Sequence, residues 1–369
     1  MRAISCWALL LLVLFVVIAT SYCNIGSVMH AMGTYVSALE KFNNAFVIRE
    51  KVHGKDHSDT GVSYENIGSV MHAMGDNVGA LENLNKALAI FEKALGKEHP
   101  DIATSYSTIG SVMHAMGDNV SALEMLNKAL VIRQNVVGEE HPDTATSYSN
   151  IGDVMQDMDD NVGALEMYHK ALAIREKLFG KEHTDTGDSY SNIGNVMQDM
   201  DDNIGALKMH YKALAICEKA LGKEHSNTGN SFSNIGNVMM DMGDNIGALN
   251  MHYKALAICE KLFGKEHPSI ATSYSTIGVV MLDMGAYIGA LEMNKKGLAI
   301  REKVLGEDHP DTAESYSNIG YMMQGRGDNV GALEMHNKAL AIFEKALGKE
   351  HPDTIDSSNA VAAILEIYE

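Results

Sequence analysis

The sequence predicts an all-α solenoid of helix-turn-helix repeats, because one unit recurs every 42 residues over nearly the whole chain of 369 residues. Units of this length stack in a row, and each contacts only its neighbours. Residues 20–352 hold eight units, preceded by a hydrophobic segment at 1–19 and followed by a capping helix at 353–369. One aromatic position marks the period, and its occupants are Tyr22, Tyr64, Tyr106, Tyr148, Tyr190, Phe232, Tyr274 and Tyr316.

The N-terminal segment is apolar without interruption over residues 7–19 and follows a basic residue, Arg2. This pattern is typical of a signal peptide, and the apolar stretch is shorter than the roughly 20 residues that span a bilayer. Cleavage after Ala19 would leave Thr20 at the start of the first repeat. Alternatively, the segment is the apolar start of a truncated array in a cytoplasmic protein. The secretory pathway and the cytoplasm both remain open.

The cysteines are expected to be free thiols. Cys217 and Cys259 take the same place in adjacent repeats. Helices packed about 8–10 Å apart hold such residues too far apart for a disulfide. Cys6 and Cys23 complete the set. Free thiols fit a reducing compartment, which favours the cytoplasm over the secretory pathway.

Each repeat combines two amphipathic helices, as the fourth unit illustrates. Residues 146–158 place Ile151 and Asp153 on opposite sides of a first helix. Residues 162–178 form the second helix, which Gly180 is expected to end in left-handed geometry. Between the two helices, Gly caps the first and Asp or Asn caps the second.

The linkers between repeats set the helix starts. Proline is tolerated in a helix chiefly at its first position. All five prolines follow a linker histidine, and they are Pro100, Pro142, Pro268, Pro310 and Pro352. Linker histidines such as His99 and His141 invite a metal hypothesis, but each stands alone in its turn, so a local capping or packing role is favoured. A last helix over 354–368 closes the array.

The composition narrows the function. A net charge of −19 disfavours nucleic acid, since phosphate contacts need clustered Lys and Arg. Basic or polar peptides are compatible partners, although acidity also serves solubility alone. No nucleophile elbow, phosphate loop or catalytic carboxylate pair occurs, so we expect no enzyme, no catalytic residues and no cofactor. Zinc is not expected at His30, His72 and His114, because equivalent residues of adjacent repeats lie about 8–10 Å apart.

A specific set of residues defines the repeat, and in the fourth unit it is Tyr148, Ile151, Gly152, Met155, Ala164 and Ala171. This spacing resembles the tetratricopeptide pattern of an aromatic residue, Leu-Gly, a large residue and two alanines. The 42-residue period and the long second helix are similar to the kinesin light chain variety. The resemblance covers residues 20 to about 352.

Two departures from known relatives limit the partners. Kinesin light chains bind the heavy chain through a heptad coiled coil ahead of the repeats, and no heptad tract precedes Thr20, so we do not expect kinesin heavy chain as a partner. Some tetratricopeptide proteins hold the acidic tails of heat-shock chaperones with Lys and Arg on the first helices. This chain offers Ser149, Asp153 and Gln156 there, so acidic tails would be repelled.

The resemblance implies that a polar stripe of the first helices lines the concave face of a right-handed superhelix, where such proteins bind peptides. In kinesin light chains the asparagine on this stripe bonds the peptide main chain, as an amide that both donates and accepts can do. Thr108 and Thr276 fill two gaps in this ladder, whose asparagines are Asn24, Asn66, Asn150, Asn192, Asn234 and Asn318. The alternative is that these residues bond within the array.

Neighbouring stripe positions change along the chain, from Ser and His through an acidic middle to an apolar end at Val279 and Tyr321. Four carboxylates on one wall would attract a Lys- or Arg-bearing peptide. We call them the acidic strip: Asp157, Asp199, Asp241 and Asp283. The remaining members of the predicted site are Asp153, Gln156, Asn195 and Asn237. An ordinary solvated face is the alternative.

The sequence therefore predicts a non-catalytic scaffold that binds peptide segments of other proteins on its concave face. A structural or self-associating array is the competing class, and a kinesin light chain-like cargo adaptor rests on family analogy alone.

Overall fold

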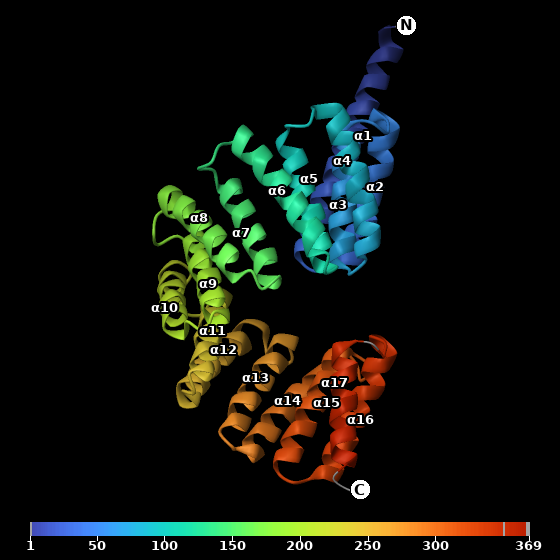
Figure 1. The fold of residues 1–369 in the computed structure, drawn as a ribbon. Helices are drawn as coiled ribbons and strands as arrows, with labels where there is room; N and C mark the ends of the chain where they lie inside the picture. Colours follow the sequence, from blue (N-terminus) through green and yellow to red (C-terminus); the bar gives the residue numbers. More distant parts are fainter. Residues whose placement is uncertain (1, 350, 367–369) are drawn as a thin grey trace. The chain divides into compact units, whose positions relative to one another are not determined.

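The computed structural model describes residues 2–349 and 351–366, in which helices joined by short turns are the regular secondary structure (Figure 1). The helices of these residues are α1 (Arg2–Ala31), α2 (Tyr35–His53), α3 (Ser58–Ala73), α4 (Asn77–Leu95), α5 (Pro100–Ala115), α6 (Asn119–Val136), α7 (Pro142–Asp157), α8 (Asn161–Phe179), α9 (Thr184–Asp199), α10 (Asn203–Ala220), α11 (Ser226–Asp241), α12 (Asn245–Phe263), α13 (Pro268–Asp283), α14 (Tyr287–Val304), α15 (Pro310–Gly325), α16 (Asn329–Ala346) and α17 (Pro352–Leu365). The predicted fold class is confirmed. The last helix begins two residues earlier than expected, and Tyr368 lies outside the described residues.

Each repeat is a pair of consecutive helices that pack along their length, such as α3 with α4 and α5 with α6. The chain divides into two compact units, which we call unit 1 (residues 1–180) and unit 2 (residues 181–369). Unit 1 holds repeats one to four, and unit 2 holds repeats five to eight with α17. Within each unit the second helix of one repeat also packs on the first helix of the next.

The linker histidines cap the first helices, as the local hypothesis predicted. In α7, Nδ1 of His141 accepts a hydrogen bond from the backbone N–H of Asp143 at 3.2 Å, and Pro142 occupies the first helical turn. The bond satisfies one of the donors that every helix start leaves open. The same cap recurs at His57, His99, His183, His225, His267, His309 and His351.

The two turns of the repeat demand different backbone geometry. After the first helices of the fourth and fifth repeats, Asp159 and Asp201 have φ of 61°, in the left-handed region where the other repeats place glycine. After the second helix, Gly180 has φ 86° and ψ 170°. This glycine is therefore not in the left-handed helical region that we expected, but in an extended region of positive φ that is essentially restricted to glycine.

Close helix packing within a repeat depends on small residues. Ala164 and Ala171 of α8 are fully buried against α7. A Cβ atom added at Gly152 would lie 2.9 Å from Cε1 of Tyr168, so only glycine fits at this crossing. The conserved geometry explains why the glycine and the two alanines recur at the same positions in the sequence.

The N-terminal segment is continuous in structure with the first helix of the first repeat. Helix α1 continues through residues 19 and 20 without a break, and Ala19 is buried. Of the described residues, Leu12–Ala31 is the one helical stretch long and apolar enough to cross a membrane. Cys6 lies outside the described side chains, whereas Cys23, Cys217 and Cys259 are free, as expected. Cleavage after Ala19 stays a prediction.

Candidate functional site

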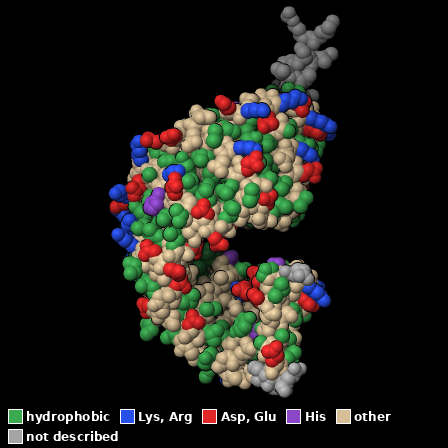
Figure 2. Space-filling view, viewed as in Figure 1, with side chains coloured by type: hydrophobic (Ala, Val, Ile, Leu, Met, Phe, Trp, Pro, Cys, Tyr) green, Lys and Arg blue, Asp and Glu red, His purple; other side chains and the backbone are tan. Residues whose placement is uncertain are grey.

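The first helices form one side of each unit. In unit 1, α3 contacts α5 and α5 contacts α7; in unit 2, α9 contacts α11 and α13 contacts α15. We call this side the inner face, defined in the fourth repeat by Asn150, Asp153, Gln156 and Asp157 and elsewhere by the equivalent residues. Figure 2 shows acidic side chains distributed over the visible surface of both units, among many hydrophobic ones.

The asparagine ladder lies on the inner face but is only partly accessible. Asn24 is exposed, whereas Asn66, Asn150, Asn192, Asn234 and Asn318 are half-buried. Ser149, which we expected on the solvent side of its helix, is instead buried and only 7% exposed. Half-buried amides keep some contact with solvent, so the ladder remains open to a ligand.

Two members of the predicted site are drawn together by a tyrosine of the second helix. The hydroxyl of Tyr168 donates to Oδ1 of Asp153 at 2.6 Å and also approaches Oε1 of Gln156 at 3.3 Å. Burial of the carboxylate raises the pKa of Asp153, and the bond from Tyr168 opposes that rise. Although Asp153 as a residue is exposed, its carboxylate therefore turns partly into the array rather than fully to solvent.

The acidic strip is exposed, and two of its carboxylates are held by the preceding repeat. In unit 1, Oδ2 of Asp157 lies 2.6 Å from Nε2 of His114. In unit 2, Nε2 of Gln198 donates to Oδ2 of Asp241 at 2.5 Å. The side chain of Asp157 is still 62% exposed in its pair. These bonds orient the carboxylates without removing them from solvent.

Carboxylates accompany the apolar residues at the C-terminal end of the inner face. A cavity of about 290 Å³ lies there between α15 and α17, and it is lined by Tyr321, Ser317 and four carboxylates. Those carboxylates are Asp311, Glu314, Asp353 and Asp356. The change of stripe residues along the sequence did not predict these carboxylates, because they belong to other positions of the repeat and to the last helix. Acidic charge therefore extends beyond the four residues of the acidic strip.

Sequence reasoning also missed a buried position on the second helices. It faces the invariant glycine of the first helix, and its occupants are Phe42, Leu84, Leu126, Tyr168, His210, His252, Asn294 and His336. All eight are at most 3% exposed. In the sequence, this position changes from an apolar residue in the first three repeats to histidine in the fifth, sixth and eighth. This change could have drawn attention to the position.

The buried histidines of unit 2 are neutral. Among the described residues, neither ring nitrogen of His210 or His336 has a hydrogen-bond partner, and Nε2 of His252 has none. Burial lowers the pKa of all three imidazoles, that of His210 to about 4. An imidazolium without a partner would be costly in this environment.

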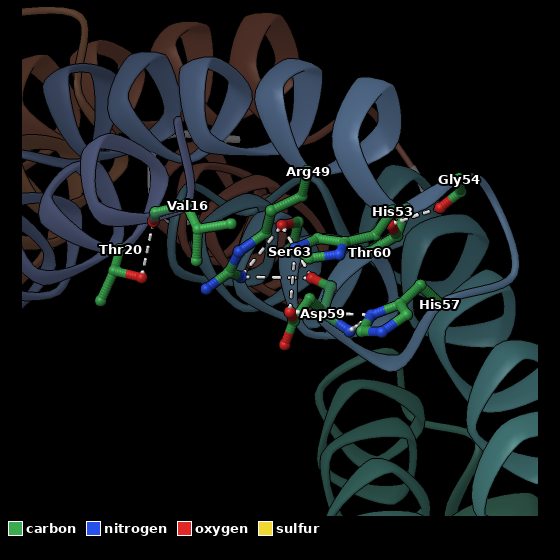
Figure 3. Close-up of polar contacts among 9 residues, drawn as sticks. All are labelled: Val16, Thr20, Arg49, His53, Gly54, His57, Asp59, Thr60 and Ser63. Carbon is green, nitrogen blue, oxygen red and sulfur yellow. Dashed lines mark hydrogen bonds and ion pairs between the residues drawn. The ribbon is translucent and has the colours of Figure 1, made fainter. Parts of the chain in front are cut away.

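One group of side chains has the composition of a metal site (Figure 3). Ligand atoms of His53, His57 and Asp59 all lie within 4.8 Å of one another. The two imidazoles are stacked, with centroids 4.4 Å apart and planes 21° from parallel, so their in-plane lone pairs do not converge. Nδ1 of His57 already accepts the N–H of Asp59.

The same cluster has a structural explanation. Phe263 stacks on the capping His267 in the sixth repeat with centroids 4.7 Å apart, so His53 takes the place of an apolar residue over a cap. In Figure 3, Arg49 reaches the backbone carbonyl of Asp59 and the hydroxyl of Ser63, both at 3.2 Å. The arrangement is therefore that of a braced helix start.

The three histidines of the N-terminal inner face have separate surroundings. His30 packs near the ring of Tyr35, Nδ1 of His72 lies 2.8 Å from Oδ1 of Asn77, and His114 pairs with Asp157. Each of these three histidines thus has its own local partner among the described side chains.

Comparison with known proteins follows this geometry. The tetratricopeptide repeat family matches residues 17–93, 63–135, 101–177, 143–203, 186–227, 228–303, 277–343 and 311–368. The chain belongs to the tetratricopeptide repeat family. Its repeat recurs every 42 residues, and the sequence prediction of a tetratricopeptide protein is confirmed. No curated protein matches this tetratricopeptide chain.

Solved structures share the tetratricopeptide fold at low identity. A putative kinesin light chain of Podosopora anserina with nearly identical repeats is 24% identical, covers 56% of this chain and 99% of its own, and has a TM-score of 0.50. BtubC (BKLC) from P. vanneervenii is 19% identical, with coverage of 64% and 92% and a TM-score of 0.52. The apo form of RapI is 16% identical, with coverage of 82% and 99% and a TM-score of 0.57. Tetratricopeptide arrays generally serve protein–protein interaction.

Proposed function

We propose that this protein is a non-catalytic scaffold that binds basic or polar peptide segments of other proteins on its inner face. The observation that carries the proposal is the exposure of the acidic strip on the first helices, in a stripe that contains no Lys or Arg among its described residues. The acidic cavity between α15 and α17 adds to the same potential. Negative charge along one face raises the association rate of cationic peptides.

The neutral groups between the carboxylates support recognition of a main chain. The amides of Asn66, Asn150, Asn192 and Asn234 are half-buried and therefore restricted in their rotamers. Restriction before binding lowers the entropy lost when a peptide is held. Amide side chains of this kind can both donate to and accept from a peptide bond.

The test is a charge-matched pair of variants. Replacing Asp157, Asp199, Asp241 and Asp283 with Asn should weaken the binding of peptides selected from a random library and flatten the salt dependence of the affinity. The control replaces Glu82, Glu124, Glu166 and Glu292 with Gln. These residues pair with lysines one turn away on the second helices, so the control changes the net charge equally, away from the inner face. Equal effects of both variants would contradict the proposal.

A second candidate, a self-associating array, is favoured by one observation. The start of every second helix carries a β-branched apolar residue that is 71–77% exposed: Val36, Val78, Val120, Val162, Ile204, Ile246, Ile288 and Val330. An apolar row of this regularity could pair with the same row of a second copy. Sedimentation velocity over a range of concentrations decides between them, since a scaffold stays monomeric and an array does not. A cargo-adaptor role has family likeness as its only support.

A further inference from the structure

A small polar cavity opens on the inner face of unit 2. It lies between α11 and α13, with α12 beneath, and its volume is about 220 Å³. The lining residues are Ser233, Asn237, His252, Thr272, Ser273 and Thr276. The volume is below the roughly 300–1,000 Å³ typical of pockets for drug-sized ligands, so the cavity suits a single side chain.

The spacing of the first helices explains why the cavity exists here. α9 contacts α11 and α13 contacts α15, whereas α11 and α13 approach each other less extensively. At the equivalent floor positions of unit 1, Leu84 and Leu126 are buried and apolar. His252 takes this place beneath the cavity, with its Nε2 packed against Gly236 and without a hydrogen-bond partner among the described residues.

Two hydroxyl oxygens and one amide oxygen give the cavity its hydrogen-bond acceptors. The hydroxyl of Ser273 donates to the carbonyl of Ser269 at 3.0 Å, and that of Thr276 donates to the carbonyl of Thr272 at 3.2 Å. Both hydroxyl protons are thus committed to α13, and the oxygens keep lone pairs for another donor. The amide oxygen of Asn237 adds a third acceptor.

The charge of the cavity is compatible with a cation. Its lining contains no Lys or Arg. Burial lowers the pKa of His252, which disfavours a positive charge on the imidazole beneath the cavity. Asp241 follows Asn237 by one turn of α11 and is exposed, but its carboxylate accepts a bond from Gln198 of α9, so it lies outside the cavity lining.

We propose that this cavity binds the guanidinium group of an arginine side chain from a partner peptide, an inference that rests on the proposed peptide-binding function and names one residue of its ligand. A guanidinium carries five N–H donors in a planar fork, which matches acceptors arriving from both α11 and α13. A lysine ammonium has three donors on a compact, strongly hydrated charge and satisfies this arrangement less well.

The experiment titrates the full chain with N-acetyl-arginine amide and, separately, with the neutral isostere N-acetyl-citrulline amide. Backbone amide shifts of Asn237 and Thr276 report on the cavity. We expect saturable shifts with the arginine probe and at least tenfold weaker binding of the citrulline probe. Thr276→Val, which removes one acceptor without changing the shape, should weaken the arginine probe roughly tenfold, since hydrogen bonds to charged groups are among the stronger ones.

The matched control is Thr108→Val in unit 1. Thr108 makes the same bond to its own helix, to the carbonyl of Thr104 at 3.0 Å, but the equivalent floor residue is Leu84. We expect this variant to bind the arginine probe like the unaltered chain. Equal binding of the two probes, equal effects of the two threonine variants, or no saturable shift would each overturn the inference.

Failure of this inference differs from failure of the proposed function. If library-selected peptides bind and respond to the acidic strip while the arginine probe leaves the cavity unperturbed, the inference is wrong and the proposed function stands. If the arginine probe saturates the cavity but no peptide binds to the inner face, the inference about guanidinium holds and the proposed function is wrong.

Discussion

Units 1 and 2 share one backbone repeat but fill its interior differently. At the buried position of the second helix, unit 1 has Phe42, Leu84, Leu126 and Tyr168, and unit 2 has His210, His252, Asn294 and His336. Each side chain meets the glycine of the first helix at close range; a Cβ at Gly110 would lie 2.9 Å from Cγ of Leu126, and one at Gly194 would lie 2.7 Å from Cε1 of His210. This position therefore requires a side chain that fits against the glycine, but it accepts both apolar and polar side chains. A titratable side chain there makes the stability of the repeat depend on pH.

One buried titratable group in each unit has a shifted pKa, and the two contributions to stability depend on pH in opposite directions. In unit 1, burial raises the pKa of Glu65 to about 7, with a bond from the hydroxyl of Ser105 opposing the rise. A raised pKa means that the folded state binds the proton more tightly, so this contribution is present at low pH and is lost as pH rises through about 7. In unit 2, the lowered pKa of His210 means that the unfolded state binds the proton more tightly. That contribution is present above about pH 6.5 and is lost as pH falls toward 4.

The largest expected effect comes from removing the buried imidazoles. Replacing His210, His252 and His336 with Leu should abolish the loss of stability of unit 2 between pH 6.5 and 4. For His210 alone this loss corresponds to about 3 kcal/mol. Hydrogen-exchange protection of each repeat, corrected for the intrinsic rate at each pH, measures the effect locally, which a stack governed by nearest neighbours requires.

The reverse exchange is the control for the histidine variants. Leu126→His places the same imidazole in unit 1, and it should make the third repeat lose protection on acidification. If both units of the unaltered chain lose protection at the same pH, the contrast between their interiors does not control acid stability.

A smaller effect is expected at Glu65. Glu65→Gln keeps the acceptor for Ser105 but cannot titrate, so the gain in protection of α3 and α5 on going from pH 8 to pH 5 should disappear. Above pH 7 the variant should be more stable than the unaltered chain, because no charge is then buried. An unchanged pH profile of unit 1 would show that the carboxylate of Glu65 is solvated when ionised.

The smallest expected effect lies at the turn that both units share. Asp159 in unit 1 and Asp201 in unit 2 have φ of 61°, which costs a non-glycine residue about 1 kcal/mol. Each is also a carboxylate at the negative end of a helix dipole. Asp159→Gly and Asp201→Gly should each raise local stability by about that amount in hydrogen exchange.

Gly117 provides the control for the turn, since its φ is 80° in the equivalent place of the third repeat. Gly117→Asp should lower stability by a similar amount. Destabilisation by Asp159→Gly or Asp201→Gly would instead show that a bound partner, such as a cation shared with Asp160 or Asp202, holds these aspartates.

Local signals in the sequence determined the repeat, the helix starts and most helix ends. Pro142 after His141 fixed the beginning of a first helix because proline lacks the N–H that the interior of a helix needs. Asp160 fixed the start of the second helix because its side chain accepts the N–H of Gly163 at 3.0 Å. These interactions span only a few residues, so the sequence of a single repeat is enough to predict where its helices begin. The backbone of Gly180 was misjudged, because a glycine permits several regions of positive φ and its neighbours do not say which one is used.

The tertiary structure alone decided which polar residues are buried and what they contact. Ser149 and Asp153 lie on the polar side of the same helix, yet one is buried and the other accepts a bond from Tyr168. The cavity at His252 and the acidic cavity near Asp353 are each formed by three helices whose separation no periodicity encodes. Periodicity predicts the side of a helix, but burial and pKa depend on how closely the next repeat packs, and that distance is set by contacts between residues about 42 positions apart in the sequence.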